Sequence, residues 1–292
     1  MKKHIEFLYS IILILFSIYF VLDTLVIKKE YKKVEKTTSN IETKNINKVI
    51  KNDTTYSDDN LTIKLTEYNE YNTKIYVADV QIKDVSLLKT AFANSSYGKN
   101  ITAKTSEIAS SVNAILAING DYYGVQEKGY VLKNGVIYRN TKVDNKEDLV
   151  IYKDGSFRII NESNVSLEDL LNDGAYNVLS FGPALIENKE ISVGKNQEVG
   201  KAMSSNPRTA IGITEDNHYI FVVSDGRTSE SKGLSLFELA SFMKSIGCKT
   251  AYNLDGGGSS TMYFNGNVIN NPTTNGNRIS ERSVSDIVYV GY

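Results

Sequence analysis

Tryptophan is absent from this chain of 292 residues, and cysteine, histidine and proline are scarce. The single cysteine, Cys248, excludes a disulfide within the chain. The two histidines, His4 and His218, lie far apart in the sequence, which argues against a histidine-based triad or a zinc site. The formal net charge is −1, so no overall basic field attracts nucleic acid. We therefore expect no metal, no cofactor and no nucleic-acid partner, and the composition leaves the oligomeric state open.

The first part of the chain is a long hydrophobic segment. Phe7 to Leu22 is almost wholly apolar, and Leu25 to Ile27 extends the run. This length is near the lower limit for a helix that crosses a bilayer, about 17–25 residues. Lys2 and Lys3 precede the segment and no small-x-small cleavage site follows it, which favours a retained signal anchor over residues 1–27 rather than a cleaved peptide.

The orientation of this segment is less well defined by the sequence. Lysines at positions 28, 29, 32 and 33 follow it, and by the positive-inside rule they favour the reverse topology. A short apolar N-terminal segment is nevertheless a common export signal. We predict a single-pass protein of the cell membrane with its domain outside; a cytoplasmic domain on an N-out anchor is the alternative.

The remaining chain divides by composition into a stalk and a domain. Residues 28–58 are polar and rich in Lys, Asn, Thr and Glu, so we predict a flexible stalk. Residues 59–292 alternate as strands do, and carry Asn-Gly and Asp-Gly hairpin turns at Asn134-Gly135 and Asp154-Gly155. Helices are predicted at 105–113 and at 235–246, the second with a capping box. The pattern predicts an α+β fold with an antiparallel-rich mixed sheet and a few packed helices.

The most specific motif is NLDGGGSST, from Asn253 to Thr261. An apolar strand leads into a carboxylate, Asp255, followed by three glycines and three hydroxyls. Glycine costs backbone entropy, so a run of three indicates close approach of the backbone to a ligand, with amides turned inward as an anion cradle. A glycine-rich hairpin without a ligand is the structural alternative. The motif residues that we take as candidates are Asn253, Asp255, Gly256, Gly257, Gly258, Ser259, Ser260 and Thr261.

Four further polar clusters lie at the ends of predicted strands or close to them. Functional loops are often held in this way on a rigid frame. Their candidate residues are Asn119, Gly120 and Asp121; Arg208; Asp225 and Arg227; and Glu281 and Arg282. Guanidinium groups match phosphate oxygens bidentately, so the set favours an anionic, phosphate-bearing substrate. The sequence lacks the Lys-Ser/Thr ending of a P-loop, the GxSxG elbow and the dinucleotide GxGxxG.

Five segments in this order resemble the phosphodiester glycosidase family: AINGDYYG, NPRTAIGI, VVSDGR, GLSLFELASFMKSIGCKTAYNLDGGGSSTMYFNG and ERSVSD. The resemblance covers about residues 80–292. It implies a hydrolase that cleaves a sugar 1-phosphodiester at the anomeric carbon. Bacterial members of this family are often labelled exopolysaccharide biosynthesis proteins, which points to glycosyl phosphates of the cell envelope as substrates.

The chemistry of such a substrate allows roles to be assigned to the candidates. A phosphomonoester leaves without a strong proton donor, which relaxes the usual demand for two carboxylates. We assign Arg208, Arg227 and the amides of Gly256–Gly258 to the phosphate. Asp255 is the first choice for base or nucleophile and Asp121 the second, while Asn119 and Asn253 orient sugar hydroxyls or the carboxylates.

Two other functions stay open at this point. Cleavage of the P–O bond would make the chain a phosphodiesterase, and a tethered wall-polysaccharide binding module would need no catalysis. The arginine and carboxylate clusters favour an enzyme over a binding module.

Overall fold

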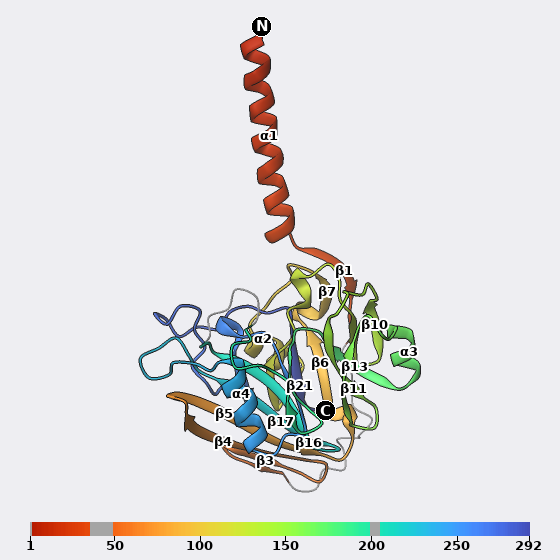
Figure 1. The fold of residues 1–292 in the computed structure, drawn as a ribbon, viewed down its shortest axis with the longest axis vertical. Helices are drawn as coiled ribbons and strands as arrows, with labels where there is room; N and C mark the ends of the chain where they lie inside the picture. The colour runs from red at the N-terminus through yellow and green to blue at the C-terminus, as the bar shows by residue number, and fades with distance from the viewer. Residues whose placement is uncertain (1, 36–48, 199–204) are drawn as a thin grey trace.

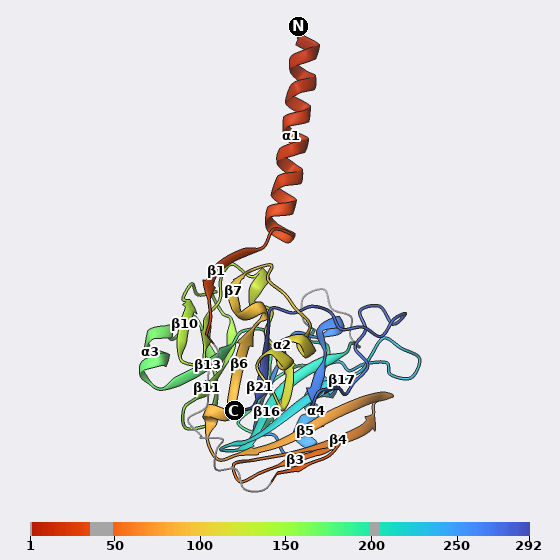
Figure 2. The ribbon, with the colours of Figure 1, turned by 180° about the vertical axis from the view of Figure 1, so that it is seen from behind.

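The computed structural model describes residues 2–35, 49–198 and 205–292. A long helix, α1 (Lys2–Leu25), projects from a sheet-rich domain in both views (Figures 1 and 2). Within it, His4–Leu25 is 22 residues long and apolar enough to cross a membrane, and none of it is buried against the domain. A signal sequence has the same properties, so the helix is an apolar N-terminal segment of either kind.

A nine-stranded antiparallel sheet carries most of the elements around the candidate site. Its order is β15-β14-β18-β16-β17-β5-β4-β3-β2. The strands are β15 (Glu190–Ile191), β14 (Ala184–Glu187), β18 (Thr250–Asn253), β16 (Arg208–Glu215), β17 (His218–Ser224), β5 (Thr73–Ile82), β4 (Leu61–Glu70), β3 (Thr55–Ser57) and β2 (Ile50–Lys51).

A five-stranded antiparallel sheet, in the order β20-β19-β8-β21-β6, packs against this sheet. Its strands are β20 (Asn267–Val268), β19 (Met262–Phe264), β8 (Leu116–Asn119), β21 (Asp286–Val290) and β6 (Leu88–Phe92). The largest hydrophobic core lies between the two sheets, where Ile63, Val80 and Phe221 of one face Ile118 and Val288 of the other.

Smaller sheets complete the domain. They are β12 (Phe157–Asn161), β11 (Glu147–Tyr152) and β13 (Ala175–Leu179); β9 (Val131–Lys133) with β10 (Val136–Arg139); and β1 (Lys29–Lys33) with β7 (Ser96–Lys99). Short 3₁₀ turns are η2 (Val85–Leu87), η3 (Ala93–Ser95), η4 (Tyr123–Val125) and η5 (Gly257–Ser259).

Helices cover the outer faces of the two large sheets. Helix α4 (Leu236–Ser245) packs its Leu239, Ala240 and Met243 on the nine-stranded sheet, and Ser235 and Glu238 form the predicted capping box. Helix α2 (Thr105–Ser111) covers the five-stranded sheet through Ile108 and Ala109. The predicted α+β, antiparallel-rich class is confirmed. Helix α3 (Leu167–Asn172), which we did not predict, is short and is capped by Ser166.

The structure differs from the predicted flexible stalk over residues 28–58. Residues 29–33 form β1 and pair with β7, while 50–51 and 55–57 form β2 and β3 at the edge of the large sheet. Residues 36–48 lie outside the described part of the chain. These polar segments form strands because they pair with strands that have unpaired backbone groups at a sheet edge. Strand formation depends on this context more than on local composition.

Candidate active site

The centre of the nine-stranded sheet brings the candidate motifs to one edge. Strand β16 pairs antiparallel with β18, so its first residue, Arg208, lies near the end of β18, where the chain continues to Asp255. Strand β17 pairs with the other side of β16, and Arg208 is opposite Ser224. The hairpin therefore returns Arg227 to the same end as Arg208, as the sequence predicts.

Asp255 is held by a compact network at this edge. The residue is 8 % exposed, and its side chain accepts a hydrogen bond of 2.6 Å from the Ser259 hydroxyl. Arg282 forms an ion pair with it at 3.1 Å from Nη2 to Oδ2, and also donates from Nε to Ser259 Oγ at 2.9 Å. Burial raises the pKa of Asp255 above its ordinary value of 3.8, and the charge of Arg282 acts in the opposite direction. Asp255 is thus a buried carboxylate with a raised pKa and a cation beside it.

Two further arginines lie beside the backbone of the glycine run that follows Asp255. Arg208 is buried, and its Nη2 contacts Glu198 Oε2 at 2.6 Å. Arg227 donates to Asn206 Oδ1 from Nε at 3.1 Å and from Nη2 at 2.8 Å. Burial lowers the pKa of Arg208, with a smaller contribution from Arg227; burial also lowers the pKa of Arg227, with Arg282 contributing. The charge of Arg227 thus acts on Arg208, and the charge of Arg282 acts on Arg227. This local positive charge makes the edge attractive to an anion.

One amide of the predicted glycine cradle is hydrogen-bonded within the protein. The amide of Gly257 donates to the Pro207 carbonyl at 2.8 Å and is therefore engaged within the protein, while the assignment of the Gly256 and Gly258 amides to a phosphate stays a prediction. A Cβ on Gly256 would lie 2.9 Å from the Pro207 carbonyl oxygen, and one on Gly258 would overlap Thr274 Oγ1. At Gly257, which has a φ of +63°, a Cβ would lie 2.9 Å from Arg227 Nη2. The glycines permit close packing around the arginines.

Asn119 connects the two large sheets behind Asp255. Its Nδ2 donates to the Asp255 carbonyl at 2.6 Å, and its Oδ1 accepts from Thr209 Oγ1 at 2.8 Å. The Gly120 carbonyl accepts from the Asp255 amide at 3.3 Å, so this segment positions the backbone of Asp255.

Asp121 is part of a separate, fully buried ion-pair cluster. Lys133 Nζ lies 2.9 Å from Asp121 Oδ2 and 2.9 Å from Asp286 Oδ2. Lys133 and Asp286 were not among the sequence candidates. The only signal is a charged residue at one end of each of two otherwise apolar strands, VLK and DIVYV. Asp121 therefore pairs with Lys133 and not with the arginines of the candidate site.

The remaining candidates support the loops around the site. Asp225 accepts from Tyr76 Oη at 3.2 Å and from the Asn271 amide at 2.8 Å, which fixes the loop after β20. Glu281 accepts from the Ser106 amide at 3.0 Å at the start of α2. Three side-chain oxygens of the glycine motif are buried without a hydrogen-bond partner among the residues that the structure describes: Asn253 Oδ1, Ser260 Oγ and Thr261 Oγ1.

A cavity of about 430 Å³ adjoins the site, and Gly182, Pro183 and Glu198 contribute to its walls. Glu198 contacts Arg208, and Asn253 donates to the Gly182 carbonyl at 2.8 Å, so the cavity borders the arginine edge. Over the described ranges 2–35, 49–198 and 205–292, no three His, Cys, Asp or Glu side chains come together to hold a metal ion.

A buried carboxylate beside two arginines, at the strand ends of an antiparallel α+β domain, is suited to contact an anionic ligand. Residues 112–291 match the model of the family described as phosphodiester glycosidase, and the chain belongs to that family. The resemblance seen in the sequence is confirmed, and the family places the chain among hydrolases.

Similar proteins come from bacteria and vertebrates. The chain is 29 % identical over 177 residues to the SPbeta prophage-derived uncharacterized protein YomE of Bacillus subtilis. This match covers 60 % of this chain and 26 % of that protein. It is 37 % identical over 93 residues to the mouse N-acetylglucosamine-1-phosphodiester alpha-N-acetylglucosaminidase, covering 30 % of this chain and 17 % of that protein. The chain thus spans well under half the length of these relatives.

The fold is similar to the catalytic domain of the zebrafish N-acetylglucosamine-1-phosphodiester alpha-N-acetylglucosaminidase, in a structure auto-inhibited by its pro-peptide. The TM-score is 0.63 at 19 % identity, with 91 % of this chain and 89 % of that chain covered. A hypothetical protein from Synechocystis matches with a TM-score of 0.61 at 16 % identity, covering 80 % of this chain and 62 % of the other. These likenesses establish the fold.

Proposed function

We propose that the chain is a membrane-anchored glycosidase that hydrolyses a sugar 1-phosphodiester at the anomeric carbon. Residues 1–27 are the anchor and residues 59–292 the catalytic domain, which lies outside the cell membrane and acts on glycosyl phosphates of the cell envelope or exopolysaccharide. The observation that carries this proposal is the Asp255–Ser259–Arg282 network beside Arg208 and Arg227.

In this mechanism the arginines bind the phosphodiester and Asp255 acts at the sugar. The carboxylate of Glu198, 2.6 Å from Arg208, marks a position where an anionic oxygen contacts this guanidinium, and a substrate phosphate would take its place. The C1–O bond breaks, and the electron pair leaves with the phosphomonoester, whose charge the arginines stabilise. Asp255 either removes a proton from the attacking water or attacks C1 itself before water releases the sugar.

Hydrolysis in ¹⁸O-labelled water tests which bond is cut. We expect the released phosphomonoester to contain no label, because water adds to the anomeric carbon. The phosphate product is the one to analyse by mass spectrometry, since the anomeric hydroxyl exchanges with solvent by ring opening. Label in the phosphate would make the protein a phosphodiesterase, and absence of turnover on any glycosyl phosphodiester would favour a binding module.

The pH dependence of turnover tests the role of Asp255. The reaction needs its carboxylate, so activity should fall as pH drops through its pKa, which burial holds above 3.8. Arg282 lowers that pKa, and Arg282→Gln should therefore move the acid limb of the pH–rate profile to higher pH. Arg278→Gln, at an exposed arginine four residues earlier, is the control. An acid limb that stays in place in Arg282→Gln would assign it to another group.

A further inference from the structure

The junction between α1 and the domain is short and fixed. Only residues 26–28 separate α1 from β1, and β1 pairs with β7. Asn100 Nδ2, next to the end of β7, donates to the carbonyls of Thr24 and Ile27, each at 3.1 Å. Lys29 forms an ion pair of 2.7 Å with Asp23 in the last turn of the helix. Both views place β1 and β7 at the end of the domain nearest α1 (Figures 1 and 2).

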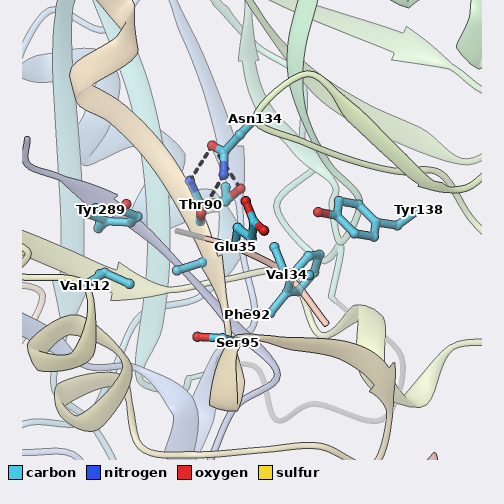
Figure 3. Close-up of a pocket in the computed structure, with 10 residues that line it drawn as sticks. Val34, Glu35, Thr90, Phe92, Ser95, Val112, Asn134, Tyr138 and Tyr289 are labelled. Carbon is cyan, nitrogen blue, oxygen red and sulfur yellow. Dashed lines mark hydrogen bonds between the residues drawn. The ribbon is translucent and has the colours of Figure 1, made fainter. Parts of the chain in front are cut away.

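Aromatic rings support β1 from below. Tyr31 of β1 lies 5.8 Å from Tyr97, measured between ring centroids, and Tyr97 stacks on Tyr123 at 5.5 Å. Phe92 contacts Tyr138 edge to face at 4.9 Å. Val34, just after β1, packs against this cluster and lines a small cavity with Phe92 and Tyr138 (Figure 3). The chain that leaves the helix thus packs against a cluster of aromatic rings.

A second cavity, of about 210 Å³, lies on the same face. Its charged wall residues are Lys99, Glu127 and Arg139, and its rings are Tyr31, Tyr97 and Tyr123. Because Asn100 fixes the end of the helix beside Lys99, this cavity lies close to the level at which an anchored helix would leave the bilayer.

Positive charge gathers around this cavity. Lys29 pairs with Asp23 at 2.7 Å, and Lys99 pairs with Glu127 at 2.8 Å. Lys32 Nζ lies 5.1 Å from the centre of the Tyr138 ring, and Lys28 adds a further charge. Lys33 pairs with Glu30 at 2.8 Å, and with Arg139 included, lysine and arginine still outnumber Asp and Glu at this junction. Tyrosine rings and lysines are the side chains found where proteins meet lipid headgroups.

We propose that this face, comprising β1 and the cavity lined by Tyr31, Lys99 and Arg139, binds the phosphate headgroups of anionic membrane lipids. This proposal rests on the membrane anchor of the proposed function. The lysines attract the phosphates, while the tyrosine rings lie at the boundary between headgroups and acyl chains. The domain therefore lies against the bilayer in one orientation and does not swing on a stalk.

The absence of tryptophan offers a direct test with the full chain in lipid nanodiscs. Tyr31→Trp introduces a single indole fluorophore at an exposed site, and Tyr71→Trp is the matched control in the exposed β4–β5 turn. Strands β4 and β5 lie at the end of the domain away from α1 (Figures 1 and 2). Brominated lipids should quench the fluorescence of Tyr31→Trp and not that of Tyr71→Trp. Quenching of Tyr31→Trp should increase as phosphatidylglycerol replaces phosphatidylcholine.

A lysine substitution tests the headgroup contact itself. In the Tyr31→Trp background, Lys32→Gln should raise the anionic-lipid fraction needed for half-maximal quenching, because one lysine near an anionic surface changes the binding constant about fivefold. Lys64→Gln, an exposed lysine on β4, should leave that fraction unchanged.

The outcomes separate this inference from the proposed function. If the chain enters nanodiscs but the two tryptophan variants are quenched equally, or quenching is independent of anionic lipid, the headgroup site is overturned and the anchor stays intact. A chain that does not co-migrate with nanodiscs overturns both. Because the readout is fluorescence, loss of the proposed hydrolase activity leaves this inference untouched.

Discussion

Asp255→Asn should retain the fold and lose nearly all hydrolysis, by about 10²–10⁴-fold in kcat, the usual contribution of a positioned acid–base group. Asparagine has the same shape and keeps an oxygen toward Ser259 and Arg282, which contact Asp255 at 2.6 and 3.1 Å. It cannot remove a proton from water or attack the sugar. The measurement is kcat on a glycosyl phosphodiester beside a thermal melt.

The control for this variant is Asp53→Asn, at an exposed carboxylate of the chain outside the site. It should change neither turnover nor melting. A fall of only two- or three-fold in Asp255→Asn, with an unchanged melt, would remove Asp255 from the catalytic role. Asp121 would then be the next carboxylate to test.

Lys133→Met should have the largest effect on stability. Lys133, Asp121 and Asp286 are almost completely buried, and removing the cation leaves two carboxylates without compensation. Breaking such a buried pair typically costs about 3–5 kcal/mol of unfolding free energy. Denaturant unfolding monitored by circular dichroism measures this loss.

The pH dependence and a compensated variant make this prediction specific. Burial, together with Asp121, already raises the pKa of Asp286 to about 7. In Lys133→Met the folded state favours protonated carboxyls more than the unfolded state does, so the deficit should be largest at high pH and shrink as pH falls. Adding Asp121→Asn and Asp286→Asn to Lys133→Met should restore much of the stability. A deficit independent of pH, with no recovery in the triple variant, would point to lost packing.

Local signals in the sequence were sufficient for the parts of the fold that depend on near neighbours. The capping box at Ser235 and Glu238 and the Asn-Gly turn at Asn134 need only a few adjacent residues, and both occur as predicted. Convergence of Arg208 and Arg227 follows from hairpin geometry alone.

Contacts between distant segments could not be predicted in the same way. The pairing of Lys133 with Asp286 joins strands about 150 residues apart, and nothing near either residue specifies its partner. The amide of Gly257 points to Pro207 because β16 lies against the glycine run, which the motif itself does not reveal. Docking of β1 likewise depends on the free edge of β7, which lies more than 60 residues further along the chain.

The pairing of β17 with β5 bears on where the domain can be cut. The family match begins at residue 112, yet β5 (Thr73–Ile82) pairs along the whole length of β17, and Tyr76 bonds to Asp225 at 3.2 Å. A chain shortened to the matched region would expose β17, six of whose seven residues are buried, as a bare apolar edge. Such edges recruit further strands, so the shortened protein should self-associate. The limits of sequence similarity are narrower than those of the unit that folds and stays soluble.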